Sequence, residues 1–107
     1  MMQPAEHLGV REFQQQIEAI YFERDSGRGK LGTFAWFVEE VGELSRAIRR
    51  GSRDNLEEEF GDCFAWLVSL ASLNGVDIAQ AAQKYARGCP RCDGTPCTCP
   101  HPQPQAD

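Results

Sequence analysis

Apolar residues recur every three or four positions along most of this chain, a spacing that predicts amphipathic α-helices. The first such pattern covers Leu8 to Arg24, and the glycines of Ser26 to Gly32 predict a loop after it. A second helical pattern runs from about Thr33 to Arg50 and stops at Gly51, a residue type that commonly ends helices. The first helix places five apolar residues on one face: Val10, Phe13, Ile17, Ile20 and Tyr21.

Two further helices are predicted in the second half of the chain. Asp54, followed three residues later by Glu57, has the spacing of a capping box and predicts a helix that ends near Asn74. Asp77 predicts the start of a short fourth helix that runs through Arg87. Because no segment alternates as a β-strand would, the sequence predicts an all-α protein, an antiparallel bundle of about four helices.

The pattern changes at Gly88. Residues 88–107 are rich in proline and cysteine, a composition that does not form a helix. The sequence therefore predicts a helical domain over residues 1–87 and a Cys-rich, non-helical C-terminal tail over residues 88–107.

The chain is short and acidic. Its 107 residues enclose only a small hydrophobic core, so we expect a homodimer or homotetramer. The net charge of −5 gives no electrostatic attraction to duplex nucleic acid or to an anionic membrane. The longest apolar run, Phe64 to Leu73, is too short for a transmembrane helix, and the N-terminus lacks a secretory apolar region. A cytoplasmic location is expected.

An acidic hexad occurs twice, as EEVGEL at 39–44 and as EEFGDC at 58–63. Residues three apart share one face of a helix, so each hexad places two acids beside an apolar stripe. The first flank holds Glu40, Glu43 and Trp36, and the second holds Glu59, Asp62 and Trp66.

The short connection from Gly51 to Arg53 predicts that these two helices pack antiparallel, with their apolar stripes facing each other. Both acid pairs would then open, nearly level, on one face of the hairpin. The stripes are Phe34, Phe37, Val38, Val41, Leu44 and Ile48 on one helix, and Leu56, Phe60, Cys63, Phe64, Leu67 and Ala71 on the other.

Four carboxylates gathered in this way repel one another, so a cation is expected among them. Hard oxygen ligands suit Mg²⁺, Mn²⁺ or Ca²⁺. A solvated acidic face without a metal is the alternative. A ferritin-like di-iron site also uses helical carboxylates but needs E-x-x-H pairs, and neither His7 nor His101 lies in such a motif.

The paired motif, E-x-x-E followed by E-x-x-D, resembles the MazG-type all-α nucleoside triphosphate pyrophosphohydrolases. The surrounding segments WFVEEVGELSRAIRR and NLEEEFGDCFAWLVSLASLNGVDI agree, and the resemblance covers about Thr33 to Lys84. It implies Mg²⁺-dependent hydrolysis of the α–β phosphoanhydride of a (d)NTP, with Mn²⁺ as an alternative metal, in a helical dimer or tetramer. It also implies a role for five acids: Glu40, Glu43, Glu59 and Asp62 as metal ligands, and Glu39 as the group that positions or deprotonates the attacking water.

Substrate-binding residues are less sharply indicated. The resemblance implies phosphate contacts for Lys84 and Arg87, although the Asn that usually follows that Lys is absent here. Trp36 and Trp66 flank the acids and either stack on a base or fill the core. Asn74 either contacts substrate or simply ends its helix. The loop cations Arg24, Arg28 and Lys30 either close over a nucleotide or remain solvated.

The tail carries Cys89, Cys92, Cys97 and Cys99 in a C-x₂-C-x₄-C-x-C pattern. Its first half, CPRCDG, is similar to the zinc knuckles of zinc-ribbon proteins, so a structural Zn²⁺ site is predicted. A disordered reduced tail and a redox or disulfide use are the alternatives. The remaining cysteine, Cys63, lies in an apolar stripe and is expected to be inert.

Two classes of function follow from these patterns. The first is a nucleotide pyrophosphohydrolase, within which a phosphoribosyl-ATP pyrophosphohydrolase is the nearest enzymatic alternative because the resemblance implies the same cleaved bond. The second is a non-catalytic helical interaction module whose tail forms a zinc-dependent contact surface. The complete acidic set favours the enzyme.

Overall fold

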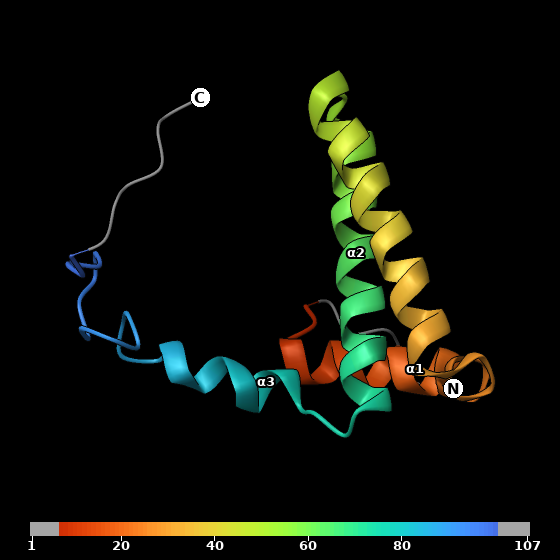
Figure 1. The fold of residues 1–107 in the computed structure, drawn as a ribbon, viewed down its shortest axis with the longest axis horizontal. Coiled ribbons are helices and arrows are strands. Elements are labelled where there is room, and N and C mark those ends of the chain that lie inside the picture. The colour runs from red at the N-terminus through yellow and green to blue at the C-terminus, as the bar shows by residue number, and fades with distance from the viewer. Residues whose placement is uncertain (1–6, 101–107) are drawn as a thin grey trace.

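A computed structural model describes residues 7–100, and within that range the only regular secondary structure is helical, as predicted (Figure 1). The long helix α1 spans Val10–Arg50, and α2 spans Arg53–Leu73. A short helix, α3, covers Ile78–Ala81 and continues as a single 3₁₀ turn, η1, over Ala82–Tyr85. α1 makes most of its tertiary contacts with α2.

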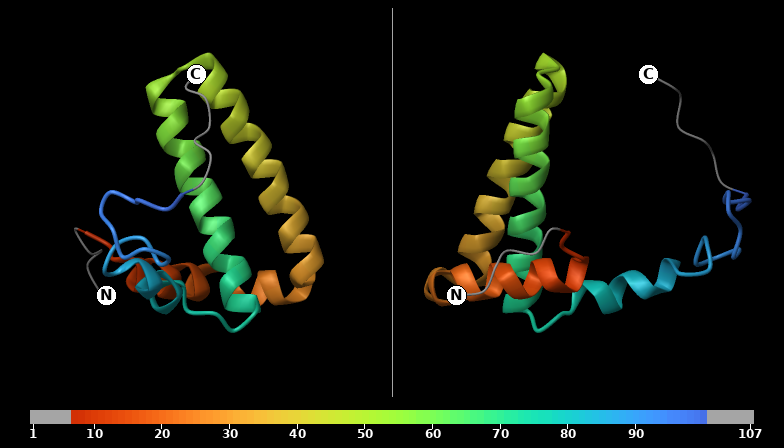
Figure 2. Two further views of the ribbon diagram at one scale, coloured as in Figure 1. Left: turned by 60° about the vertical axis from the view of Figure 1, so that its left-hand side comes forward. Right: turned by 180° about the vertical axis from the view of Figure 1, so that it is seen from behind.

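A break at Gly29 replaces the loop that the glycines of residues 26–32 predicted. α1 is helical on both sides of Gly29, which has φ 86° and ψ 170°. Glycine adopts such a positive φ readily because it has no Cβ. Arg28 pairs with Asp25 on its own side of the break (Nη1 to Oδ1, 2.9 Å) and donates to Thr33 Oγ1 on the other side (3.3 Å), so the Arg28–Thr33 bond spans the break. The two helices predicted before Arg50 are thus two halves of one element, lying at an angle to each other (Figure 2).

α1 and α2 form the predicted antiparallel hairpin. Gly51 ends α1 in the left-handed conformation, with φ 73°, and its N–H donates to the Ala47 carbonyl. The capping box predicted at Asp54 is wrong: the N-cap of α2 is Ser52, two residues earlier, and Ser52 makes no side-chain capping bond. Asp54 instead lies within the first turn of α2.

The cap predicted at Asp77 is confirmed. Its Oδ1 accepts hydrogen bonds from the backbone N–H groups of Ala79 (2.9 Å) and Gln80 (3.4 Å). The helix that follows is shorter than predicted, because the α-helical geometry ends at Ala81 and the 3₁₀ turn ends at Tyr85 rather than at Arg87.

The seam between α1 and α2 differs from the predicted pairing of apolar stripes. Ala47 and Val68 are fully buried, and Glu40 and Glu59 are half-buried in the same region. Of the twelve predicted stripe residues, four on α1 and two on α2 are exposed rather than buried in the seam. The exposed members are Phe34, Val38, Val41, Ile48, Phe60 and Leu67.

The first half of α1 crosses the lower part of the hairpin (Figures 1 and 2). The Phe13 and Phe64 rings stack there, with centroids 4.9 Å apart. Buried Gln14 donates to the Val76 carbonyl (2.8 Å) and accepts from the Ile78 N–H (2.9 Å). One side chain therefore satisfies the backbone of the turn between α2 and α3, a role that the helical pattern did not reveal.

Beyond this turn, α3 and η1 lead away from the hairpin toward the Cys-rich tail (Figure 1). Within residues 7–100, no single helix has the length and apolar composition to cross a membrane. α2 and the α3–η1 segment reach that threshold only when taken together, across a bend of 98°.

Candidate metal centre

Three acids from the repeated hexads meet in the hairpin seam. Glu40 comes from α1, and Glu59 and Asp62 come from α2. One carboxylate oxygen from each lies within 4.8 Å of the others. The spacing of three residues puts Glu59 and Asp62 on one face of α2, and the antiparallel pairing brings Glu40 opposite them. We call these three residues the acidic cluster.

The acidic cluster carries uncompensated negative charge. Burial raises the pKa of Glu40, and the neighbouring carboxylates of Asp62 and Glu59 raise it further. Glu59 Oε2 is buried and has no hydrogen-bond partner. None of the ion pairs found within residues 7–100 includes a member of the cluster. Three oxygen ligands and an orphaned buried oxygen fit a hard divalent cation such as Mg²⁺ or Mn²⁺.

Glu43 and Glu39 lie on a neighbouring face of α1. Both line an open pocket with Val38 and Arg46, and Glu43 Oε1 is 3.8 Å from Arg46 Nη1 in an exposed pair. The charge of Glu43 still contributes to the raised pKa of Glu40. The structure therefore brings three of the four predicted ligands within ligand distance and holds Glu43 beside them.

A second pocket, of about 250 Å³, opens at Asp62, the outer member of the acidic cluster. Trp66 forms part of its wall, and the Arg28 guanidinium carbon lies 5.0 Å from the Trp66 ring centroid. Trp36 stacks on Trp66 with centroids 6.1 Å apart. The remaining lining residues come from the first half of α1 and from α2: Tyr21, Arg24, Asp25, Ala65 and Ser69.

Sequence reasoning missed Asp25. This carboxylate is buried, with 4% of the residue exposed, and it holds Arg28 against the pocket wall. Its spacing from Arg28, three residues within a helix, is the signal that would have indicated the pair. The prediction of a loop from Ser26 onward hid that signal, because a loop has no fixed side-chain register.

Three predicted substrate residues, Lys84, Arg87 and Asn74, do not line the pocket at Asp62. Lys84 sits over the Tyr85 ring, 5.3 Å from its centroid, and Arg87 forms an exposed pair with Asp93 at 3.4 Å. Asn74 donates to the Leu70 carbonyl at 2.8 Å and so helps to end α2. The path of α3 and η1 away from the hairpin carries Lys84 and Arg87 with it, whereas Asn74 lies at the end of α2 (Figure 1).

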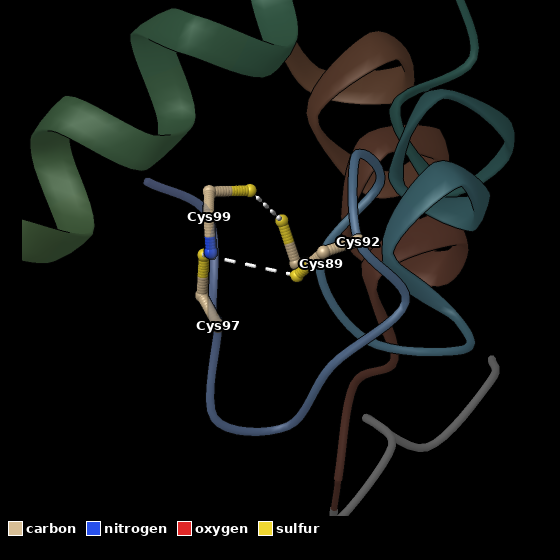
Figure 3. A group of neighbouring side chains, drawn as sticks. All are labelled: Cys89, Cys92, Cys97 and Cys99. Carbon is tan, nitrogen blue, oxygen red and sulfur yellow. Dashed lines mark hydrogen bonds between the residues drawn. The ribbon is translucent and has the colours of Figure 1, made fainter. Parts of the chain in front are cut away.

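The tail cysteines come together as well. Their four sulfur atoms all lie within 4.8 Å of one another (Figure 3). Cys63 stands apart, in the hairpin, where its Sγ donates to the Glu40 carbonyl at 3.3 Å. Burial and the charge of Glu40 raise the pKa of its thiol, so it is held protonated as a packing residue.

Comparison with known proteins agrees with this geometry. A search of curated proteins finds no match to the chain. The family model for the MazG nucleotide pyrophosphohydrolase domain matches residues 28–92. The match covers more than half of the chain and contains the break at Gly29, the whole acidic cluster and the hairpin that carries it. The chain therefore belongs to the MazG nucleotide pyrophosphohydrolase domain family.

Proposed function

We propose that this protein is a Mg²⁺-dependent nucleotide pyrophosphohydrolase that cleaves the α–β phosphoanhydride of a (d)NTP, giving the monophosphate and pyrophosphate. The observation that carries the proposal is the acidic cluster in the seam of a MazG-family hairpin. Three carboxylates meet there, and one buried oxygen of Glu59 has no hydrogen-bond partner. Such a cluster costs folding free energy unless a cation is bound, so it is better explained by function than by packing.

Glu40, Glu59 and Asp62 would hold Mg²⁺, with Mn²⁺ as a substitute. Glu43 would join them as a fourth ligand, because its pair with Arg46 is exposed and weak and therefore easily exchanged. When bound, the metal supplies neutralisation of phosphate charge and a lowered pKa for coordinated water.

Glu39 is proposed as the residue that orients the attacking water and accepts its proton at the carboxylate. It precedes the ligand Glu40, and it takes part in none of the ion pairs of residues 7–100. Replacing Glu39 by Gln should therefore abolish turnover while leaving Mg²⁺ binding largely intact, as measured by calorimetric titration. Loss of metal binding equal to that of a Glu59 variant would instead make Glu39 a ligand.

The substrate would enter the pocket beside Asp62. Arg28 has a guanidinium already held in place by Asp25, and such a group binds phosphate oxygens in a bidentate manner. Tyr21 offers an aromatic face for a base, whereas the Trp66 ring is already in contact with Arg28 and Trp36. At about 250 Å³ the pocket takes part of a nucleotide rather than the whole, so the remainder of the substrate would extend over the acidic cluster. Lys84, on η1, and Arg87, which follows it, would reach the pocket from a second copy of the chain.

The test is a panel of ribo- and deoxyribonucleoside triphosphates together with phosphoribosyl-ATP, each with Mg²⁺. We expect equimolar monophosphate and pyrophosphate from at least one triphosphate and no reaction in chelator. If phosphoribosyl-ATP alone were hydrolysed, it would be the substrate in place of a (d)NTP. Release of orthophosphate alone would contradict the cleaved bond, and no turnover of any compound would favour a non-catalytic helical module.

A further inference from the structure

The four tail cysteines form a second cluster of ligand atoms, separate from the acidic cluster. Cys89 Sγ and Cys99 Sγ are 3.6 Å apart, and Cys92 Sγ and Cys97 Sγ are 4.0 Å apart (Figure 3). Zn–S bonds of about 2.3 Å in a tetrahedron place the sulfurs about 3.8 Å from one another. The observed separations are close to that value, whereas a disulfide would require about 2.05 Å.

The backbone that carries Cys89 and Cys92 forms a tight turn. The Asp93 N–H donates to the Cys89 carbonyl (2.7 Å), and the Cys89 N–H donates to the Gly94 carbonyl (3.0 Å). A Cβ on Gly94 would lie 2.8 Å from the Pro96 carbonyl oxygen and 3.3 Å from Cys92 Sγ. Glycine at this position therefore allows the second half of the tail to close over the first.

Backbone N–H groups point at two of the sulfurs. Thr98 N–H donates to Cys92 Sγ and Cys99 N–H donates to Cys97 Sγ, both at 3.3 Å. Such N–H donors stabilise a thiolate, the form in which cysteine binds a metal ion.

We propose that Cys89, Cys92, Cys97 and Cys99 bind one Zn²⁺ in a closed, structural tetrahedral site. Four soft thiolates in this geometry select zinc rather than the hard cation of the acidic cluster. All four positions are filled by protein, so the site leaves no place for a substrate. The zinc cross-links residues 89–99, a segment with no helix or strand and with few buried groups.

Zinc is the interaction that holds this segment in shape. Within the described range, the only ion pair between the tail and the residues before it is Arg87–Asp93, and both side chains are largely exposed. An exposed pair of this kind contributes roughly 0–1 kcal/mol. Metal binding in small thiolate sites is by contrast coupled to folding, so removal of zinc should unfold the tail while the hairpin remains.

The test is metal analysis of protein purified without chelator under reducing conditions, together with cobalt substitution. We expect one zinc per chain. Co²⁺ should give the near-ultraviolet thiolate charge-transfer bands and the intense visible bands of a tetrahedral sulfur site. Cys92→Ser and Cys99→Ser should each lose both signals. Cys63→Ser, the matched control outside the cluster, should keep both.

Several outcomes would overturn the proposal. Zinc-reconstituted wild-type protein without bound zinc, or cobalt protein without thiolate bands, would show that the sulfurs hold no metal. Iron in place of zinc would overturn the choice of ion. Loss of zinc in Glu59→Gln would assign the metal to the acidic cluster instead. None of these readouts depends on nucleotide hydrolysis.

Discussion

At the scale of single residues, the chemistry concentrates in the half-buried acids Glu40 and Glu59. A hairpin seam ordinarily excludes unpaired charge, because desolvation of a carboxylate is costly. Here burial and like charge together raise the pKa of Glu40. The metal-free protein therefore carries strain at the point where the helices meet, and a bound cation would relieve it.

Glu59→Gln tests that strain. Without metal, the variant should melt a few degrees higher than wild type, because one charge leaves the cluster and the amide donates a hydrogen bond; about 1 kcal/mol corresponds to about 4–8 °C in a domain of this size. Its pyrophosphate release should fall by about 100-fold or more. Glu58→Gln, the same change one residue earlier on an exposed position, should alter neither. Equal losses of pyrophosphate release in the two variants would show that the acids act only as diffuse surface charge.

At the scale of elements, the decisive feature is the break in α1 at Gly29. It turns the first half of the helix across the hairpin and so places Arg24, Arg28 and Tyr21 beside Asp62. Without the break, α1 would run straight past the end of α2 and the pocket would lose that wall.

Gly29→Ala should therefore lower the melting temperature and weaken substrate binding, seen as a raised KM. Gly29 lies at φ 86° and ψ 170°, a region that is essentially confined to glycine, and an L-residue there costs roughly 1–3 kcal/mol. Gly27→Ala is the matched control: Gly27 lies two residues earlier in regular helix, a Cβ there meets nothing within 4 Å, and its φ is not positive. The control should be neutral or slightly stabilising, and a loss of stability equal to that of Gly29→Ala would show that the break is not specific to position 29.

The sequence could predict the features that local patterns determine. Helical spacing, the turn at Gly51 and the repeated hexads are local signals, and they correctly indicated an all-helical chain with Glu40, Glu59 and Asp62 close together. The rotation of each helix about its axis is not a local signal. An apolar stripe such as that of Val38 and Val41 has the same pattern whether it faces its own hairpin or lies outside it.

At the scale of the whole molecule, the outward stripe predicts assembly. Large apolar side chains cover much of the outer face of the hairpin and of the break, where Leu31 is 86% exposed. Phe34, Val38, Val41 and Ile48 recur at helical spacing along α1 and are all exposed, and apolar helix faces of this kind favour association between chains. We predict a homodimer or homotetramer by light scattering, and Ile48→Asp should shift it toward monomer because it places a charge in that face. A stable, cooperatively folding wild-type monomer at micromolar concentration would contradict this.

The tail should be dispensable for the helical fold. Truncation after Arg87 removes the cysteine cluster and leaves α1, α2 and their contacts, so far-UV circular dichroism per helical residue and the main melting transition should be retained. Bound zinc should disappear from the same protein. Collapse of the helical signal on truncation would mean that the tail supports the hairpin.

The position of Glu40 and Glu59 in the seam also creates a trade-off between the stability of the fold and catalysis. Replacing both residues by leucine would make the seam between the helices apolar. The hairpin would then be more stable, and its stability would not depend on metal. That hairpin would hold the same shape and hydrolyse nothing. A duplicated copy released from selection for turnover has the same route open to it, so among proteins of this architecture, unusual robustness in chelator should signal a scaffold rather than a hydrolase.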